Sequence, residues 1–81
     1  MNIKTYLFIT YNNTFIFTTD DIFESLVSVI IEGRKNGIDW TKDRVLDIAY
    51  IDENDEVSAL DMLSTSRLIM EINSLCIQLY L

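Results

Sequence analysis

The stretch IKTYLFITYNNTFIFT, residues 3–18, predicts a β-hairpin from which the rest of the fold is built outward. Its two halves, residues 3–11 and 14–18, are rich in Ile, Thr, Tyr and Phe, which favour strands. They flank Asn12-Asn13, and asparagine tolerates the positive φ angles of a tight two-residue turn. The sequence therefore predicts two antiparallel strands at the start of a sheet.

A two-residue turn also predicts the register and the faces of this hairpin. It sets Tyr11 opposite Thr14, Ile9 opposite Ile16 and Phe8 opposite Phe17. Because side chains alternate between the two faces of a strand, one face is aromatic and the other is aliphatic. The aromatic face carries Tyr6, Phe8, Phe15 and Phe17, and the aliphatic face carries Leu7, Ile9 and Ile16.

The aromatic face has two main interpretations, packing against a helix or contact with another protein. A third, stacking of single-stranded bases, conflicts with the charge of the chain. Nucleic-acid binders gain most of their affinity by neutralising phosphates, whereas Lys4 is the only basic residue among the first 33. We therefore expect no direct binding of nucleic acid.

A helix is predicted from about residue 21 to 35. Asp20 and Asp21 are N-cap candidates, and Glu24 follows Asp21 at the spacing of a capping box. The helix ends before Gly37, which can take the left-handed conformation of a helix C-terminus. Its apolar residues cover an arc of about 200°, which is wider than the stripe of an ordinary surface helix. One sheet face alone does not cover such an arc.

The middle of the chain predicts a loop, a strand and a turn. Residues 37–44 form a loop that carries the only tryptophan, and residues 45–51 form a third strand. Residues 52–55, Asp-Glu-Asn-Asp, form a turn.

The last third of the chain is less specific. Residues 57–62 fit either the returning strand of a second hairpin or the start of a helix. We favour a helix from about 64 to 74 and leave 75–81 open, because the apolar residues there match both helical and strand spacing. The predicted fold is α+β, a single domain over residues 1–81. It has an N-terminal β-hairpin, a helix, a further strand or hairpin, and a C-terminal helix with or without a last strand, so that one small sheet is packed by two helices.

The composition limits the size, the surface and the cellular location that we expect for this domain. The chain has 81 residues, no proline and two glycines, which leaves no room for a flexible linker. Its hydrophobic content of 49% exceeds what one small core readily hides, so we expect apolar surface to meet a partner or a second copy. The only cysteine, Cys76, excludes an internal disulfide. Without a recognisable secretory leader or membrane span, we expect a cytoplasmic protein.

The chain has few residues suited to catalysis, and we expect no enzyme, no cofactor and no dedicated metal site. The chain has no histidine, the commonest general base and a frequent metal ligand. Asp52, Asn54 and Glu56 alternate as in a calcium-binding loop. However, Val57 stands where such a loop needs glycine, and Leu63 stands where it needs a bidentate glutamate.

Most of the net charge of −7 is concentrated in one run that contains no basic residue. Ordinary surfaces mix both signs of charge, whereas a single-sign run attracts cationic partners. The alternative is a solvated hairpin tip that only prevents aggregation. The acidic residues of the run are Asp47, Asp52, Glu53, Asp55, Glu56 and Asp61.

Trp40 also has two interpretations. It either covers one edge of the core or anchors a partner, because tryptophan is over-represented at interface hot spots. We include it with the six acidic residues as a candidate partner-binding residue.

In size, charge and makeup the chain resembles the small acidic inhibitors encoded by phages and mobile elements, such as anti-CRISPR and anti-restriction proteins. The resemblance rests on the six acidic residues of the run together with Asp20, Asp21 and Glu24. It implies a protein that occupies the cationic groove of a nucleic-acid-binding partner. An immunity protein that neutralises a toxic nuclease fits the same composition.

The sequence therefore predicts a non-catalytic protein-binding module, a stoichiometric inhibitor whose acidic surface occupies a basic, nucleic-acid-handling protein. The alternative is a structural or assembly protein that forms a homodimer through the hairpin aromatics and the first helix.

Overall fold

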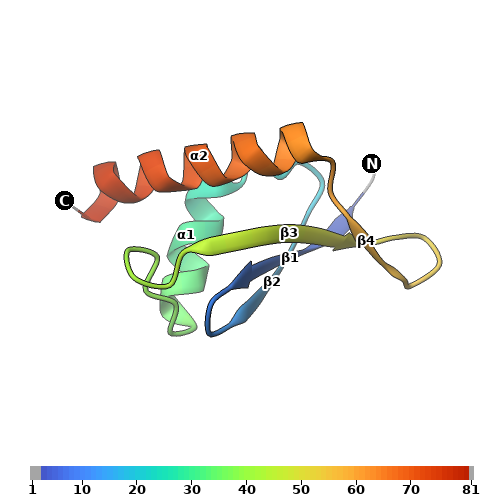
Figure 1. The fold of residues 1–81 in the computed structure, drawn as a ribbon, viewed down its shortest axis with the longest axis horizontal. Coiled ribbons are helices and arrows are strands. Elements are labelled where there is room, and N and C mark those ends of the chain that lie inside the picture. The colour runs from blue at the N-terminus through green and yellow to red at the C-terminus, as the bar shows by residue number, and fades with distance from the viewer. Residues whose placement is uncertain (1–2, 81) are drawn as a thin grey trace.

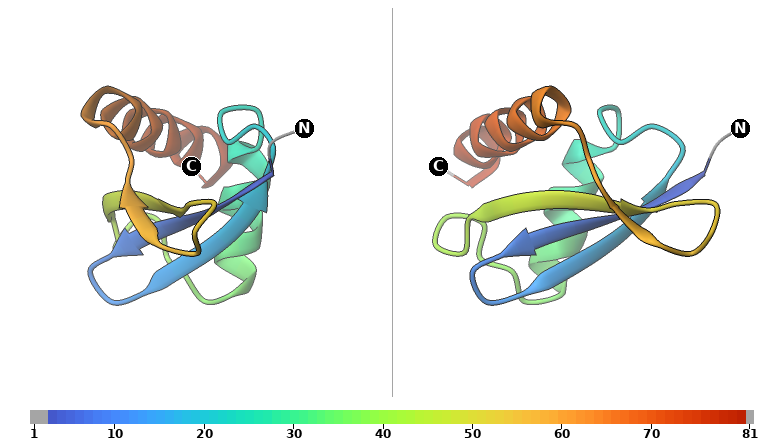
Figure 2. Two further views of the ribbon diagram at one scale, coloured as in Figure 1. Left: turned by 90° about the vertical axis from the view of Figure 1, so that its right-hand side faces the viewer. Right: turned by 45° about the vertical axis from the view of Figure 1, so that its right-hand side comes forward.

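The computed structural model describes residues 3–80 and has an α+β fold with one four-stranded antiparallel sheet and two helices (Figure 1). The strand order is β2-β1-β3-β4, and the helices line one face of this sheet (Figure 2). This arrangement confirms the predicted single sheet packed by two helices. The elements are β1 (Lys4–Thr10), β2 (Thr14–Thr19), α1 (Leu26–Lys35), β3 (Val45–Ile51), β4 (Val57–Ala59) and α2 (Met62–Tyr80).

The first hairpin forms as predicted, but its register differs by two residues. Phe8 pairs with Phe15 and Ile9 with Thr14, so the connection between β1 and β2 is longer than a two-residue turn. The Thr10 amide donates to the Asn13 carbonyl at 2.9 Å and closes this wider loop. Because a shift of two residues keeps every side chain on its face, the aromatic and aliphatic faces are still correct.

The wider loop is bonded to Asp43, a buried carboxylate from the segment before β3. Its Oδ2 accepts hydrogen bonds from Thr10 Oγ1 and Asn13 Nδ2, both at 2.8 Å, and its Oδ1 accepts the Asn12 amide at 3.1 Å. Burial acts to raise the pKa of Asp43, but the hydrogen bonds from Asn13, Thr10 and the Asn12 amide outweigh it and lower the pKa. A tight turn at Asn12 and Asn13 would leave this carboxylate without these donors.

The first helix begins later than predicted, at Leu26. Asp21 does accept the amides of Phe23 and Glu24 with its Oδ1, at 3.1 and 3.3 Å, but these bonds close a turn that precedes α1. The reciprocal half of a capping box is absent from the described residues, because the Asp21 amide donates to Thr19 Oγ1. At the other end Gly37 has a φ of 90°, as the helix C-terminus predicts.

The second half of the chain resolves the two open assignments. Residues 45–51 form β3 as predicted, and the region from residue 57 contains a short returning strand, β4, rather than the start of a helix. The predicted helix 64–74 is longer at both ends, because α2 runs from Met62 to Tyr80. Residues 75–80 are therefore helical, and the prediction for residue 81 lies outside the described residues.

The aromatic face of the hairpin forms the floor of the hydrophobic core. Tyr6, Phe8 and Phe15 are buried there, and Phe17 is partly buried against them. The structure therefore confirms packing and excludes these rings as an exposed interface. The helices supply the other side of the core, with Leu26, Val29 and Ile30 from α1 and Leu68, Ile72 and Cys76 from α2.

Trp40 is a core residue rather than an exposed anchor. Its side chain is only 5% exposed, its indole Nε1 donates to the Ile30 carbonyl at 2.8 Å, and its ring meets Phe15 edge-on at 6.3 Å. The ring lies so close to α1 that a Cβ atom at Gly33 would be 2.9 Å from Trp40 Cε2 and closer still to Cζ2. Only glycine at position 33 lets the indole lie against the helix.

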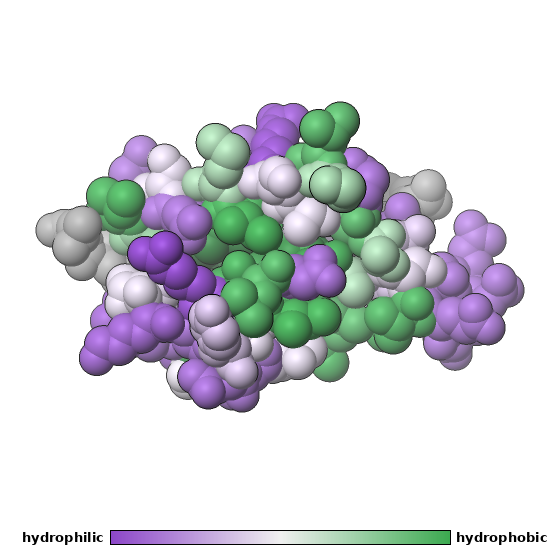
Figure 3. All heavy atoms as spheres, in the orientation of Figure 1, coloured by the Kyte–Doolittle hydropathy of each residue, from purple (hydrophilic) through white to green (hydrophobic). Residues whose placement is uncertain are grey.

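The face of the sheet opposite the helices is open. Ile16, Leu46 and Val57 are exposed there or beside it, and the space-filling view shows an apolar area over β1, β2 and β3 (Figure 3). Among residues 3–80 no helix combines the length and the hydropathy needed to cross a membrane.

We expect Gly33→Ala to destabilise the fold by about 1 to 3 kcal/mol, because the added methyl group overpacks the contact with Trp40. Urea unfolding followed by circular dichroism measures this change. Ser28→Ala is the matched control, since Ser28 is exposed on the same helix and alanine favours helices there. Equal stability of the two variants would contradict the close contact.

Asp43 also predicts a pH dependence of stability. Because its pKa is lowered in the folded state, its stabilising effect is complete above the unfolded-state pKa of about 3.9 and is lost as the pH falls through the folded value. We expect Asp43→Asn to lower the Tm at pH 7 and to flatten the fall of Tm below about pH 4. Asp20→Asn, at an exposed residue for which no hydrogen bond is found, should keep the wild-type profile. A wild-type acid profile in Asp43→Asn would refute this role.

Candidate protein-interaction site

The loop between β3 and β4 projects from the body of the protein and carries four residues of the acidic run (Figure 1). We call residues 52–56 the acidic tip. In the space-filling view the same end of the molecule is uniformly hydrophilic, in contrast to the apolar area beside it (Figure 3). The β3–β4 hairpin thus holds the four acidic residues of this loop away from the core.

Asp52 organises the acidic tip. Its Oδ1 accepts the amides of Asn54 at 2.9 Å and Glu56 at 3.0 Å, and its Oδ2 accepts the hydroxyl of Ser58 at 3.0 Å. The Asp52 amide donates to the Glu56 carbonyl at 2.9 Å. These hydrogen bonds lower the pKa of Asp52, those from the amides of Glu56 and Asn54 most, so the carboxylate stays charged well into the acidic range.

The remaining carboxylates of the tip project from this turn. Glu53, Asp55 and Glu56 are exposed, and no side-chain hydrogen bond or ion pair to any of them is found within residues 3–80. Asp55 has a φ of 60°, a left-handed conformation that aspartate and asparagine adopt more readily than most residues. A fixed turn therefore presents three unneutralised carboxylates.

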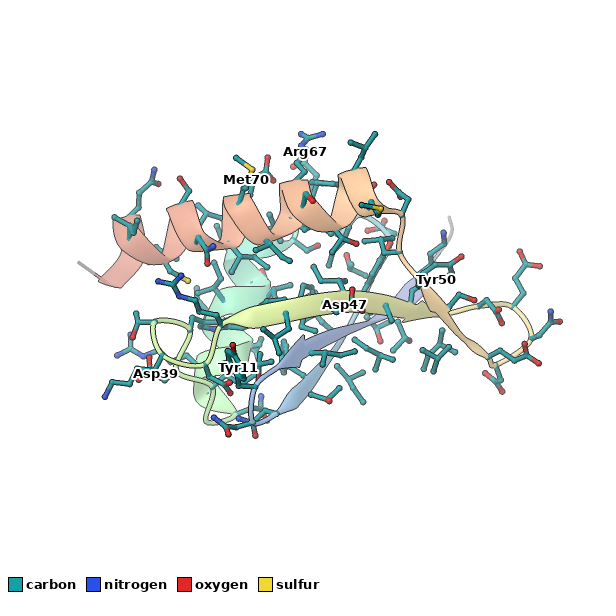
Figure 4. All side chains as sticks on the ribbon, viewed as in Figure 1. Tyr11, Asp39, Asp47, Tyr50, Arg67 and Met70 are labelled. Atoms are coloured by element: carbon teal, nitrogen blue, oxygen red, sulfur yellow. The ribbon has the colours of Figure 1, made fainter. Side chains whose placement is uncertain are left out.

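The other two acidic residues of the run lie elsewhere and bond the backbone. Asp61 precedes α2 and its Oδ2 accepts the Ser64 amide at 2.9 Å, which caps the helix and lowers the pKa of Asp61. Asp47 lies in the middle of β3 (Figure 4), at a register shift between β1 and β3, and its Oδ1 accepts the Ile48 amide at 2.9 Å. Both carboxylates thus satisfy local amides.

The structure thus divides the seven candidate residues. Glu53, Asp55 and Glu56 are presented together, Asp52 supports them, Asp47 and Asp61 are separate from them, and Trp40 is buried. An N-cap at Asp61 is visible in the sequence, because aspartate is a favoured N-cap residue and Asp61 stands just before the apolar positions of a helix. Asp47 has no comparable sequence signal, since a register shift in a sheet depends on the partner strand.

A hollow beside the tip was not predicted. It has a volume of about 460 Å³ and combines an aromatic ring, the Tyr50 side chain, with the carboxylates of Asp52 and Glu53. The Lys4 ammonium group already lies 5.0 Å from the centre of the Tyr50 ring, a cation–π contact. The hollow is lined by Ile3, Lys4, Tyr50, Ile51, Asp52, Glu53 and Asn54.

Neither a metal-binding cluster nor an exposed thiol is found among residues 3–80. No group of three or more Asp, Glu, Cys or His side chains is arranged there to hold a metal ion. The thiol of Cys76 is buried, and burial raises its pKa, which keeps it protonated and unreactive.

Comparisons with known proteins identify no relative. No family model matches the chain, and no curated protein and no solved structure is significantly similar to it.

We expect Asp52→Ala to loosen the acidic tip, because it removes the acceptor of two amides and one hydroxyl. Hydrogen exchange measured by NMR should show faster exchange of the Asn54 and Glu56 amides, while the amides of β1 remain protected. The matched control is Asp55→Asn, at a tip residue whose side chain accepts no bond and whose left-handed backbone suits asparagine. Unchanged exchange in Asp52→Ala would show that the turn is held by other contacts.

Proposed function

We propose that this protein is a non-catalytic binding module that engages a basic protein through the acidic tip. The observation that supports this proposal is the turn held by Asp52, which presents Glu53, Asp55 and Glu56 with no ion pair to any of them among residues 3–80. Exposed like charges on a fixed turn cost stability through mutual repulsion, and a cationic partner relieves that repulsion.

The hollow beside the tip supports the same chemistry. An aromatic face next to two carboxylates is an environment that favours a lysine or arginine side chain. The contact between Lys4 and Tyr50 is an intramolecular example of this preference. A partner's arginine that displaces the Lys4 ammonium group from the hollow would stack on Tyr50, and the exposed Glu53 carboxylate would accept its hydrogen bonds.

The partner class follows from this charge pattern. Proteins that handle nucleic acid carry grooves lined with lysine and arginine, and carboxylates spaced along a turn imitate phosphates in such a groove. A stoichiometric inhibitor of such a protein, of the anti-CRISPR or immunity-protein kind, is therefore our leading proposal. Direct binding of nucleic acid conflicts with a net charge of −7.

The decisive variant neutralises the tip without disturbing the turn. We expect Glu53→Gln, Asp55→Asn and Glu56→Gln together to leave the Tm within about 3 °C of wild type, because exposed charges contribute little to stability. Asp52 is kept because it holds the turn. Proteins retained from a host lysate by the immobilised wild type should be lost with this variant, and the association rate of a retained partner should fall on the order of tenfold.

The matched control removes three charges elsewhere. Asp20→Asn, Glu24→Gln and Glu32→Gln change the net charge equally, at exposed residues away from the tip. This variant should retain the same partners as the wild type. Equal loss in both variants would mean that net charge alone drives retention, and retention by the tip variant would place the binding surface elsewhere.

A further inference from the structure

The two edges of the sheet differ in how they are protected from pairing with other strands. The β4 edge has only three residues, and Glu56 and Asp61 flank it. A short strand with neighbouring charges resists edge-to-edge association. The β2 edge has six residues, Thr14 to Thr19, with no charge and no proline, and it forms the lower border of the sheet in Figure 1.

The backbone of β2 has unused hydrogen-bonding groups on this edge. In an antiparallel pair, residues alternate between those bonded to the neighbouring strand and those that point away. The Thr10 amide donates to the Asn13 carbonyl, so Thr10 and Asn13 are a hydrogen-bonded pair, and every second residue of β2 after Asn13 is bonded to β1 in the same way. The backbone groups of Phe15 and Phe17 therefore point toward β1. The amides and carbonyls of Thr14, Ile16 and Thr18 then point outward, and no backbone partner for them is found among residues 3–80.

The sequence of this edge is a palindrome. Residues 14–18 read Thr-Phe-Ile-Phe-Thr in both directions, with Ile16 at the centre. A symmetric dimer requires one surface to complement itself about a two-fold axis. Antiparallel pairing centred on Ile16 meets this requirement, since it sets each Ile16 against its copy, Thr14 against Thr18 of the second copy, and Phe15 against Phe17 of the second copy. Threonine pairs and aromatic pairs of this kind are favourable across strands.

The charge distribution permits this pairing. The acidic tip joins β3 to β4, at the opposite edge of the sheet from β2. In a dimer formed through β2 the two tips therefore lie at the far ends of one continuous sheet, where their repulsion is smallest. Asp20, the first acidic residue after β2, would lie opposite Asn12 of the second copy rather than opposite another carboxylate.

From these observations we propose that a second copy of this chain docks on the β2 edge, and that the two copies form a symmetric eight-stranded sheet. The side chain of Ile16, 58% exposed on the open face, becomes covered by its own copy. About six backbone hydrogen bonds over so short a strand bury less area than a standard interface, so we expect dissociation constants in the micromolar range.

Sedimentation equilibrium between about 10 and 500 µM tests this dimer. We expect a monomer–dimer equilibrium that strengthens with added salt, because salt screens the repulsion between two chains of charge −7. An association driven by the acidic tip would weaken with salt instead. A monomer over the whole range, or weakening by salt, would overturn the proposal.

Two variants locate the contact. Ile16→Lys sets two ammonium groups against each other at the two-fold axis, and we expect it to weaken the dimer on the order of tenfold or more. Val57→Lys is the control, because Val57 is a similarly exposed β-branched residue, 66% exposed, on the opposite edge strand. It should leave the dimer intact. A dimer that persists in Ile16→Lys, or is lost equally in Val57→Lys, would overturn the proposal.

Hydrogen exchange gives an independent readout in the wild type. The amides of Thr14, Ile16 and Thr18 should exchange fast in dilute solution and slowly at high concentration, while the Phe15 and Phe17 amides are protected at both. Fast exchange of the three outward amides at every concentration would exclude pairing through β2.

Discussion

The hydrogen bonds of the buried Asp43 carboxylate are the interaction on which the rest of the structure depends. It joins the β1–β2 loop to the segment before β3 through three donors. A buried charge without such donors is costly, so the loop adopts the width that supplies them. That width sets the pairing of Phe8 with Phe15. The cross-strand pairing within the aromatic floor, on which Trp40 and both helices pack, therefore follows from one side chain that lies more than 30 residues from Thr10 in the sequence.

Local patterns predicted most of the fold. Alternation in β1 and β2, glycine after α1 and the apolar run of β3 are signals within a few residues, and the structure confirms the elements they predict. The register of the first hairpin could not be predicted this way, because Asp43 lies far from Asn12 and Asn13 in the sequence. The late start of α1 has a local cause instead, since the Asp21 amide donates to Thr19 Oγ1 and the two amides that Asp21 accepts close a turn before the helix.

The acidic run shows why the candidate site was only partly predictable. Apart from the N-cap signal at Asp61, the six carboxylates look equivalent in the sequence, whereas in the structure Asp52, Asp47 and Asp61 accept backbone amides. A carboxylate that caps a helix and one that is exposed for a partner have the same side chain, so only the nearby backbone amides distinguish them. Trp40 gave the same ambiguity. It was resolved by Gly33, which lies seven residues earlier and leaves room for the indole ring.

The burial of Trp40 also gives the protein an internal optical probe. As the only tryptophan, it accounts for nearly all of the long-wavelength emission, and that emission comes from a buried indole bonded to a helix carbonyl. Its spectrum therefore reports whether α1, the loop after it and Phe15 are assembled. None of these contacts involves the β3–β4 loop. A red shift in emission thus marks disruption of the core, and a binding signal without such a shift marks an event on the surface.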